Sequence, residues 1–524
     1  MTIKIQDVAI ATIMEKNFEK ALSIGNKYSF LNANLFPMLS KEERDTFTEF
    51  QDHGKKMFPL AQQHTDDVYP LFPKIGENYM IQRMNPYKDI PGSCKTQMLL
   101  NLAGNMVSPE LDVGVTASGI LVGNSLLHNP NRPAIQNDAL EGIYNGTKIG
   151  GIGITELEHG SDAVNMKTKA SIAENGDITY NGIKIYTTNG PVADIFSTYG
   201  VTDVSDPRRT MMLTMFQRGD EGLVPEKLVI PGAAGIAVGK VTYNNVTVPK
   251  DRMLAPPGEG YKRLFRGLTP ERIGIISGSL AGIWNSLTHG VIYTQLRHQF
   301  GKPLFKYQGI SFKLAELYAR TSALTAFSFQ IADAYDKTVG VKIHHGETPN
   351  ATDESAIAIA AAQGKYLTAK FSHEIAYEVA QMMGGRGALD EPLSNSQINR
   401  LENGTRITEV LGGHRNIQLL IATMGLAGTS AMAITSNIKK EKRKEGKIQA
   451  QLAEMYVARA QKMLAADGTL ISEKTRLKLE STMNKHLAAV EAKDKREAAF
   501  FASGLVRLIG TAGKEIYKAK KKAA

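Results

Sequence analysis

The sequence predicts a multidomain α+β protein in which a helical domain, a β-rich domain and a helical bundle follow one another, with a further helical extension at the end. Apolar residues recur at three- and four-residue spacing over 1–145, which is typical of helices. Over 146–255 apolar and polar residues alternate instead, as in strands. The helical spacing returns over 256–428 in long segments rich in small residues, and it continues through the basic region 429–524.

Length and composition favour a globular protein of several domains. A chain of 524 residues exceeds what one ordinary core supports, and 42% hydrophobic with 22% charged residues excludes whole-chain disorder. The single cysteine, Cys94, excludes an internal disulfide and fits a reducing compartment. The first residues contain Asp7, Glu15 and Glu19 and resemble no signal peptide, so we expect a cytoplasmic protein.

The net charge of +10 is concentrated at the C-terminal end. Residues 431–524 hold 21 of the 62 Lys and Arg but only 10 of the 52 Asp and Glu. The rest of the chain is therefore nearly neutral.

Two local patterns within 146–255 predict turns. Asn175-Gly176, between alternating segments, predicts a β-hairpin. "GIGITELEHGSD", residues 151–162, is not a dinucleotide fingerprint, because Glu156 occupies the place of the third glycine and no helix is expected after it. Its Gly160-Ser161-Asp162 turn could hold a phosphate or a cofactor edge, or be an ordinary β-turn.

A second glycine turn separates two helical segments in "RITEVLGGHRNIQLLIA", residues 406–422. Glycine lets another group approach the main chain closely, and the nearest acid is Glu409. His344 and His345 have no spaced carboxylate or cysteine partner, so no metal site is predicted.

Four segments, in order, resemble the FAD-dependent acyl-CoA dehydrogenases. They are "ITELEHGSD", "NGIKIYTTNG", "RHQFGKPLFKYQGISFKLAELY" and "QMMGGRGALDEP". The resemblance covers residues about 20 to 425. It implies a β-barrel-like middle domain, a C-terminal four-helix bundle, FAD as cofactor, and α,β-dehydrogenation of an acyl-CoA thioester.

The resemblance also implies the roles of individual residues. Thr155 and Thr188 would hydrogen-bond the flavin edge, Tyr186 would back the ring where the family usually has Trp, and Ser161 would contact a cofactor phosphate or the acyl-CoA. The pyrophosphate and adenosine end would be bound partly across a subunit boundary by Arg297, Gln299, Phe300, Gln308, Gln381, Gly384 and Gly385.

The catalytic base is expected on a different element from the one many relatives use. Many members of the family place a glutamate before a "GT" in the turn where this chain has Gly412. Isovaleryl- and long-chain acyl-CoA dehydrogenases place it on the helix after the β domain, directly before an arginine, and Glu271-Arg272 matches that arrangement. Apolar neighbours would raise the pKa of Glu271.

Other roles for these residues remain open. Thr269-Pro270-Glu271 could equally be a helix start with an acid in its first turn, and Glu409 is a second candidate base. The Gly412 amide would support the thioester carbonyl, and Arg272 would contact the substrate.

The implied partners are an acyl-CoA substrate, an electron-transfer flavoprotein as electron acceptor, and further copies of the chain. An alternative comes from the alkylation-response flavoproteins, which share the fold and bind DNA through a basic C-terminal domain. "KKEKRKEGK", residues 439–447, mixes acids with bases, so nucleic-acid binding is disfavoured. "AAFFASGLVRLIG" would suit a packed helix or a peripheral membrane contact.

Overall fold

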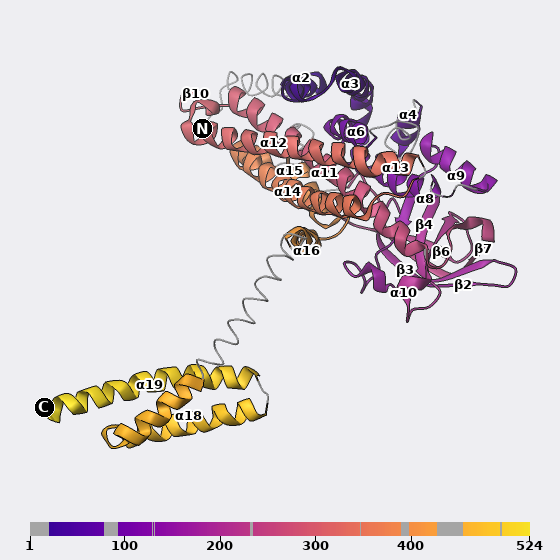
Figure 1. Cartoon of the computed structure of the whole chain (residues 1–524). Coiled ribbons are helices and arrows are strands. Elements are labelled where there is room, and N and C mark those ends of the chain that lie inside the picture. Colours follow the sequence, from indigo (N-terminus) through magenta and orange to yellow (C-terminus); the bar gives the residue numbers. More distant parts are fainter. Residues whose placement is uncertain are drawn as a thin grey trace, which may run out of the picture. The chain divides into compact units, whose positions relative to one another are not determined.

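The computed structural model divides the chain into two compact units, Met1–Gly425 and Leu426–Ala524 (Figure 1). The described residues are 20–77, 93–127, 129, 132–230, 234–345, 347–388, 398–426, 454–492 and 495–523. Within the first unit, helices are followed by a sheet and then by long helices. This is the order that the sequence predicts.

The N-terminal helices pack around one apolar core. They are α2 (Ile24–Leu35), α3 (Lys41–Ala61), α4 (Phe72–Gly76), α6 (Ser93–Val107), α7 (Pro109–Thr116), α8 (Gly123–Leu127) and α9 (Ala134–Tyr144), with a π-helical turn, Ala117–Val122, between α7 and α8. A capping box starts α3: the Ser40 hydroxyl accepts from the Glu43 N–H, and the Glu43 carboxylate accepts from the Ser40 N–H.

One mixed sheet forms the middle of the first unit. Its strands are β1 (Gly150–Gly153), β2 (Lys169–Ile172), β3 (Ile178–Thr188), β4 (Ile195–Val201), β5 (Met211–Gln217), β6 (Leu223–Leu228), β7 (Val238–Val248) and β8 (Met253–Ala255). Their order is β6-β7-β3-β2-β4-β5-β8, and β1 pairs with β4 in parallel. The predicted hairpin is confirmed: β2 and β3 pair antiparallel, and Gly176 has a φ of 90° in the turn.

The β-barrel-like closure expected of this domain is wrong, because the described strands form an open sheet. A barrel requires the two edge strands to pair with each other. Here β6 and β8 are the two ends of the strand order. The middle of the sheet is also narrow, since β2 meets β4 at only one residue pair, Lys169 with Val201.

The helical bundle consists of α11 (Gly260–Leu296), α12 (Gln308–Tyr335), α14 (Ala351–Met383) and α15 (Ile398–Val410), followed by α16 (Arg415–Leu426). The helices α11 and α14 run in the same direction, and small residues let them approach closely. A Cβ at Gly282 would lie 3.1 Å from Ser372 Oγ, and one at Gly290 would lie 2.9 Å from Val379 Cγ2.

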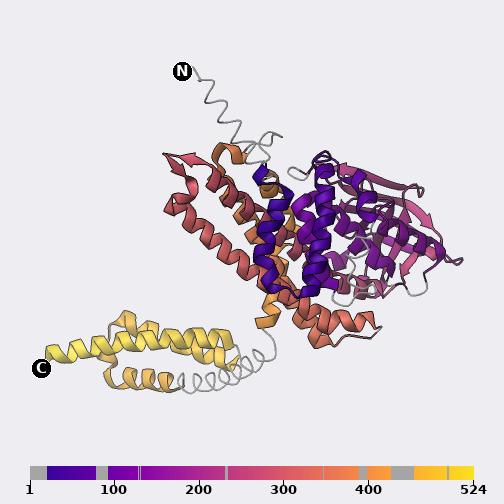
Figure 2. The same ribbon diagram turned by 90° about the horizontal axis from the view of Figure 1, so that it is seen from above.

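The longest helix, α11, begins earlier than the sequence suggests. A helix start at Thr269-Pro270 is wrong, because α11 already begins at Gly260 and Pro270 lies inside it. Proline is tolerated there although it cannot donate the usual hydrogen bond to the preceding turn. Both views show the sheet near one end of the bundle and the short hairpin β9 (His298–Gln299) with β10 (Lys302–Pro303) at the other (Figures 1 and 2).

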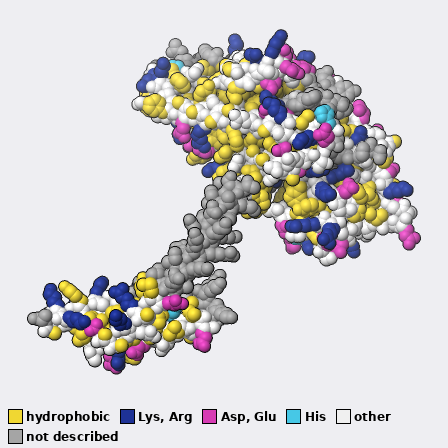
Figure 3. Space-filling model, viewed as in Figure 1, with side chains coloured by type: hydrophobic (Ala, Val, Ile, Leu, Met, Phe, Trp, Pro, Cys, Tyr) yellow, Lys and Arg dark blue, Asp and Glu magenta, His cyan; other side chains and the backbone are white. Residues whose placement is uncertain are grey.

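The second unit is a small helical domain with its own core. It contains a helix over 454–467, α18 (Glu473–Glu491) and α19 (Lys495–Ala523). Leu505, Ile509, Ala512 and Ile516 of α19 are buried against the other helices, which supports the packed-helix interpretation. Its visible face mixes basic, acidic and apolar side chains (Figure 3). Residues 439–447 lie outside the described residues. In the part of the chain that is described, no helix is both long and apolar enough to cross a bilayer.

Candidate active site

Glu271 lies inside α11, facing the glycine turn that joins α15 to α16. A Cβ placed on Gly412 would be only 3.4 Å from Glu271 Oε1. Burial raises the pKa of Glu271 to about 7, while Arg272 and Lys365 act in the opposite direction. Tyr199 of β4 is close enough for the Glu271 carboxylate to act on its phenol. Burial is the main cause that raises the pKa of Tyr199, and the negative charge of Glu271 raises it further. The acid therefore lies where the bundle meets the sheet.

The turn itself has a backbone that glycine favours. Gly412 has a φ of 59° and Gly413 a φ of 100°, both in the left-handed region. A Cβ at Gly412 would also lie 2.6 Å from Ile275 Cδ1, which is too close without movement. Ile275 and Glu271 thus occupy the space that a side chain at position 412 would need.

A buried lysine from α14 holds this turn. The Nζ of Lys365 donates to the carbonyls of Gly413, at 2.5 Å, and Glu409, at 3.2 Å. Burial lowers its pKa to about 8. The Gln418 amide donates to the carbonyls of Gly412 and Gly413 at 3.0 and 2.8 Å. Sequence reasoning missed both residues, although a lysine within the apolar stretch "AIAAAQGKYL" was a usable signal.

The structure explains the polar residues that follow the glycines. His414 starts α16: its carbonyl accepts from the Ile417 N–H at 2.8 Å and its Nδ1 accepts from the Asn416 N–H at 3.3 Å. Arg415 forms an ion pair with Glu409 at 3.7 Å. Glu409, the second candidate base, is thus engaged in a structural contact.

Three residues predicted to contact the flavin ring gather on the sheet. The Ile185 N–H donates to the Thr155 carbonyl at 2.8 Å, which brings Thr155 beside Tyr186 and Thr188 of β3. Tyr186 has a φ of 57° at a register shift between β3 and β7, and its side chain is 64% exposed. An exposed ring held by an unusual backbone suits contact with a planar ligand.

A buried ion pair supports the adjoining loop. Glu156 contacts Lys184 Nζ at 2.8 Å, and its carboxylate accepts from the N–H groups of Lys167 and Thr168 at 2.6 and 2.8 Å. It closes the loop that carries Ser161, which is exposed. Glu156 is therefore a structural residue, and the short helix that follows is not a dinucleotide-binding helix.

The remaining predicted cofactor residues lie at the far end of α11. They are Arg297, Gln299, Phe300, Gln308, Gln381, Gly384 and Gly385. Phe300 is 93% exposed at the tip of the β9–β10 hairpin, with a φ of 50°. The Tyr293 hydroxyl donates to the Met383 carbonyl at 3.2 Å, which joins the end of α11 to the glycine turn after α14. Open space surrounds the Cβ positions of Gly384 and Gly385.

These residues form a second group, well separated from Glu271. Glu271 and Arg297 are 26 positions apart on or directly after one helix, which corresponds to roughly 39 Å. Figures 1 and 2 show the β9–β10 hairpin and the sheet at opposite ends of the bundle. Within one chain, the base lies against the glycine turn, the predicted ring-contact residues lie together on the sheet, and the predicted pyrophosphate residues lie at the far end of α11.

Comparison with known proteins identifies the family of the chain. The middle domain of the acyl-CoA dehydrogenases matches residues 151–246, and their C-terminal domain matches residues 258–427. An acyl-CoA dehydrogenase of Bacillus subtilis (strain 168) is 30% identical over 288 residues, covering 55% of this chain and 70% of that protein. The chain belongs to the acyl-CoA dehydrogenase family. The predicted family and enzyme class are thereby confirmed.

Solved structures confirm the acyl-CoA dehydrogenase fold. Butyryl-CoA dehydrogenase from Megasphaera elsdenii superposes with a TM-score of 0.65 at 24% identity, covering 74% of this chain and 99% of that one. A glutaryl-CoA dehydrogenase from Mycobacterium smegmatis, solved in complex with FADH2, gives 0.63 at 20% identity, covering 75% and 96%. The predicted cofactor class agrees with these relatives, and the DNA-binding alternative finds no support among them.

Proposed function

We propose that this family member catalyses FAD-dependent α,β-dehydrogenation of an acyl-CoA thioester to the enoyl-CoA, with Glu271 as the base. The supporting observation is the 3.4 Å between Glu271 Oε1 and the Cβ position of Gly412. Many relatives carry their glutamate at the position of Gly412. The carboxylate on α11 therefore reaches the region that a side chain on the turn would otherwise enter, as the isovaleryl- and long-chain type of active site requires.

The chain's own groups divide the work around the substrate. Glu271 removes the α-proton, and its pKa of about 7 leaves about half of it ionised at neutral pH and makes it more basic than an ordinary carboxylate. The Gly412 amide donates to the thioester oxygen and stabilises the enolate-like charge. Arg272 and Ser161 contact the acyl-CoA. FAD, when bound, accepts the β-hydrogen as a hydride.

The residues on the sheet fit one side of a flavin. Thr155 and Thr188 bond the edge of the ring and Tyr186 backs it, a role that the 64% exposure of the Tyr186 side chain supports. Tyr186 is smaller than the family's usual Trp, but it keeps an aromatic face.

The pyrophosphate group of residues completes the cofactor site of another copy of the chain. Arg297 and the amides near Gly384 are exposed and suit a diphosphate. They lie too far from Glu271 to serve the same flavin, so the working enzyme is a homo-oligomer with sites shared between subunits. An electron-transfer flavoprotein is the proposed acceptor.

The direct test uses the visible spectrum of the purified protein. We expect a bound flavin that is bleached anaerobically by at least one member of a panel of branched, cyclic and straight-chain acyl-CoA esters. A protein that binds no flavin, or whose flavin no thioester reduces, would contradict the proposed function.

A further inference from the structure

A row of buried amides runs along α6. Gln97, Asn101 and Asn105 recur every fourth residue and are all buried, so they lie on one face of the helix. Among the described residues, neither amide atom of Gln97 has a hydrogen-bond partner, and the same is true of the Oδ1 atoms of both asparagines. Leaving a buried polar group unpaired destabilises the fold, so the row calls for a physical reason.

The row faces the part of α11 that carries the proposed base. A Cβ at Gly274 would lie 2.7 Å from Gln97 Nε2, and one at Gly278 would lie 3.8 Å from Asp112 Oδ2. Gly274 and Gly278 follow Glu271 by three and seven residues, which places them on the same side of the helix. Along the axis, Gln97 and Asp112 are therefore roughly 5 and 10 Å from the base.

A second helix adds polar groups to the same space. The Asn101 amide donates to Asp112 Oδ2 at 3.4 Å and to Thr116 Oγ1 at 3.2 Å, both on α7. Burial raises the pKa of Asp112 to about 8, so a protonated carboxyl is available as a donor. Asp112, but neither Gln97 nor Asn101, also lines a cavity of about 60 Å³ between α3, α6 and α7.

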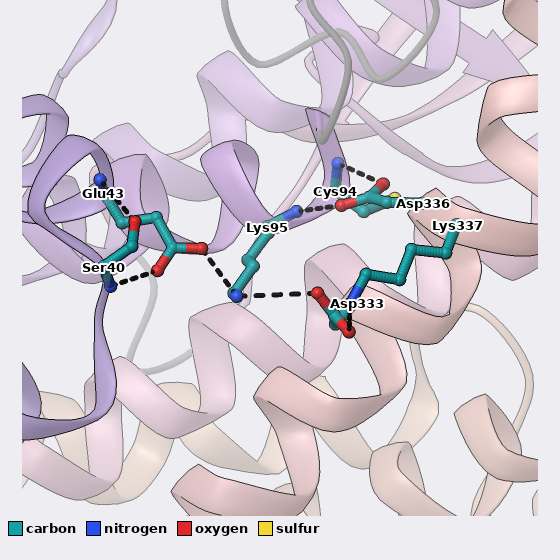
Figure 4. Close-up of polar contacts among 7 residues, drawn as sticks. All are labelled: Ser40, Glu43, Cys94, Lys95, Asp333, Asp336 and Lys337. Atoms are coloured by element: carbon teal, nitrogen blue, oxygen red, sulfur yellow. Dashed lines mark hydrogen bonds and ion pairs between the residues drawn. The ribbon is translucent and has the colours of Figure 1, made fainter.

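The start of α6 is held firmly by other helices (Figure 4). The Asp336 carboxylate accepts from the N–H groups of Cys94 and Lys95, each at 3.0 Å. The Lys95 ammonium contacts Glu43 at 2.6 Å. Gln97 follows within the same turn, so its side chain is carried by a fixed backbone. Fixed polar groups are what selective hydrogen bonding needs.

We propose that the acyl group of the substrate carries an uncharged hydrogen-bonding group, such as a hydroxyl, carbonyl or carboxamide, and that Gln97 with Asn101 and Asp112 recognises it. This rests on the proposed function, because Glu271 marks where the α-carbon lies. A carboxylate tail would be buried as a charge, and Gln97, Asn101 and Asp112 supply no cation to pair with it; an alkyl tail would leave the amides unpaired. Sites built to hydrogen-bond a substrate group reject analogues that lack it.

The test compares two matched pairs of thioesters on the flavin-loaded enzyme: butyryl-CoA with 4-hydroxybutyryl-CoA, and hexanoyl-CoA with 6-hydroxyhexanoyl-CoA. In at least one pair we expect kcat/KM for the hydroxylated ester to be roughly 100-fold higher. Gln97→Leu should remove this preference without lowering the Tm, because it replaces an unpaired buried amide by an apolar side chain.

Gln51→Leu is the matched control. Gln51 is also a buried glutamine of the N-terminal helices, but its amide is paired with Asn32 at 2.7 and 2.9 Å. This variant should keep the preference. The inference is overturned if alkyl esters react as well as hydroxylated ones, or if Gln97→Leu keeps the preference. If no thioester bleaches the flavin at all, the proposed function fails first and takes the inference with it.

Discussion

The two ends of α11 differ in how completely one chain builds them. At the Glu271 end, the acid lies against the Gly412 turn, and the fully buried Lys365 donates a hydrogen bond to that turn. At the other end, Arg297 and Phe300 are exposed on a two-stranded hairpin. We therefore propose that proton removal belongs to one subunit, whereas cofactor anchoring requires a second.

The largest expected effect tests the Glu271 end alone. Glu271→Gln should lower kcat/KM by roughly 1,000-fold or more while FAD stays bound, because the amide cannot accept the α-proton. Glu409→Gln is the matched control and should stay within a few-fold of the parent, since Glu409 pairs with Arg415 instead. Stopped-flow bleaching of the flavin measures both. Loss of turnover in Glu409→Gln with activity kept in Glu271→Gln would assign the base to Glu409 of α15.

The second prediction tests whether the two ends serve different cofactors. Arg297→Ala should weaken FAD binding by roughly 10- to 100-fold, because it removes a charge-assisted contact to a diphosphate. When Arg297→Ala and Glu271→Gln chains are co-expressed, mixed oligomers contain intact sites, built from the base of one chain and the hairpin of the other.

If the two kinds of chain assemble at random into symmetric dimers, about half of the dimers contain one of each. One of the two sites in each mixed dimer is intact, so about a quarter of all sites should be intact. The flavin bleached per subunit measures this fraction. Failure to recover activity above that of either parent would mean that both ends act within one chain.

The same contrast shows what sequence could and could not predict. The order of the domains, the Asn175-Gly176 hairpin and the Gly412 turn follow from local patterns, so they were accessible. Sheet closure was not, because it depends on whether β6 and β8 meet across the domain. The start of α11 was misplaced, since Pro270 fits a first helical turn as well as it fits an interior position that packing supports.

The missed residues share one property: their partners are distant in the sequence. Lys365 bonds to Gly413, and Gln97 lies against Gly274. The apolar stretch around Lys365 is a hint of burial, whereas nothing in the sequence around Gln97 distinguishes it from an ordinary polar residue. A buried polar group becomes informative only when the element opposite to it is known. Residue roles at the hairpin end, by contrast, came from motif resemblance and stay predictions.

A third prediction concerns electrostatics at the Glu271 end. The kcat/KM of the parent enzyme should rise with pH and level off above about 7, because only the ionised carboxylate acts as base. The Lys365 ammonium lowers the pKa of Glu271. Lys365→Met should therefore move the rising limb of the kcat/KM pH profile to higher pH. It should also reduce kcat roughly tenfold, because the turn loses the hydrogen bonds that hold it. Lys370→Met, an exposed lysine on the same helix, should change neither. An unmoved limb in Lys365→Met would show a purely structural role.

A fourth prediction concerns the effect of the same carboxylate on the stability of the folded protein. The folded pKa of Glu271 is raised, so its ionisation opposes folding: the penalty is absent below the unfolded pKa and is fully present once the pH exceeds about 7. Glu271→Gln should thus increase the free energy of unfolding at pH 8 by on the order of 2 kcal/mol, and by much less at pH 5. Urea denaturation at the two pH values measures the difference, and an equal change at both would show that the carboxylate is not buried as a charge.

The smallest expected effect concerns the space between Ile275 and Gly412. Gly412→Ala places a methyl group on a left-handed backbone and 2.6 Å from Ile275 Cδ1, so it should cost about 1–2 kcal/mol of stability. Adding Ile275→Val removes that Cδ1 atom and should recover the steric part but not the backbone part. The coupling energy of the double-mutant cycle should be about 0.5–1 kcal/mol. Because the clash and the backbone strain act on different atoms, additive effects would show that the turn can move away from α11. A turn that moves so easily could not hold a thioester oxygen in a fixed place.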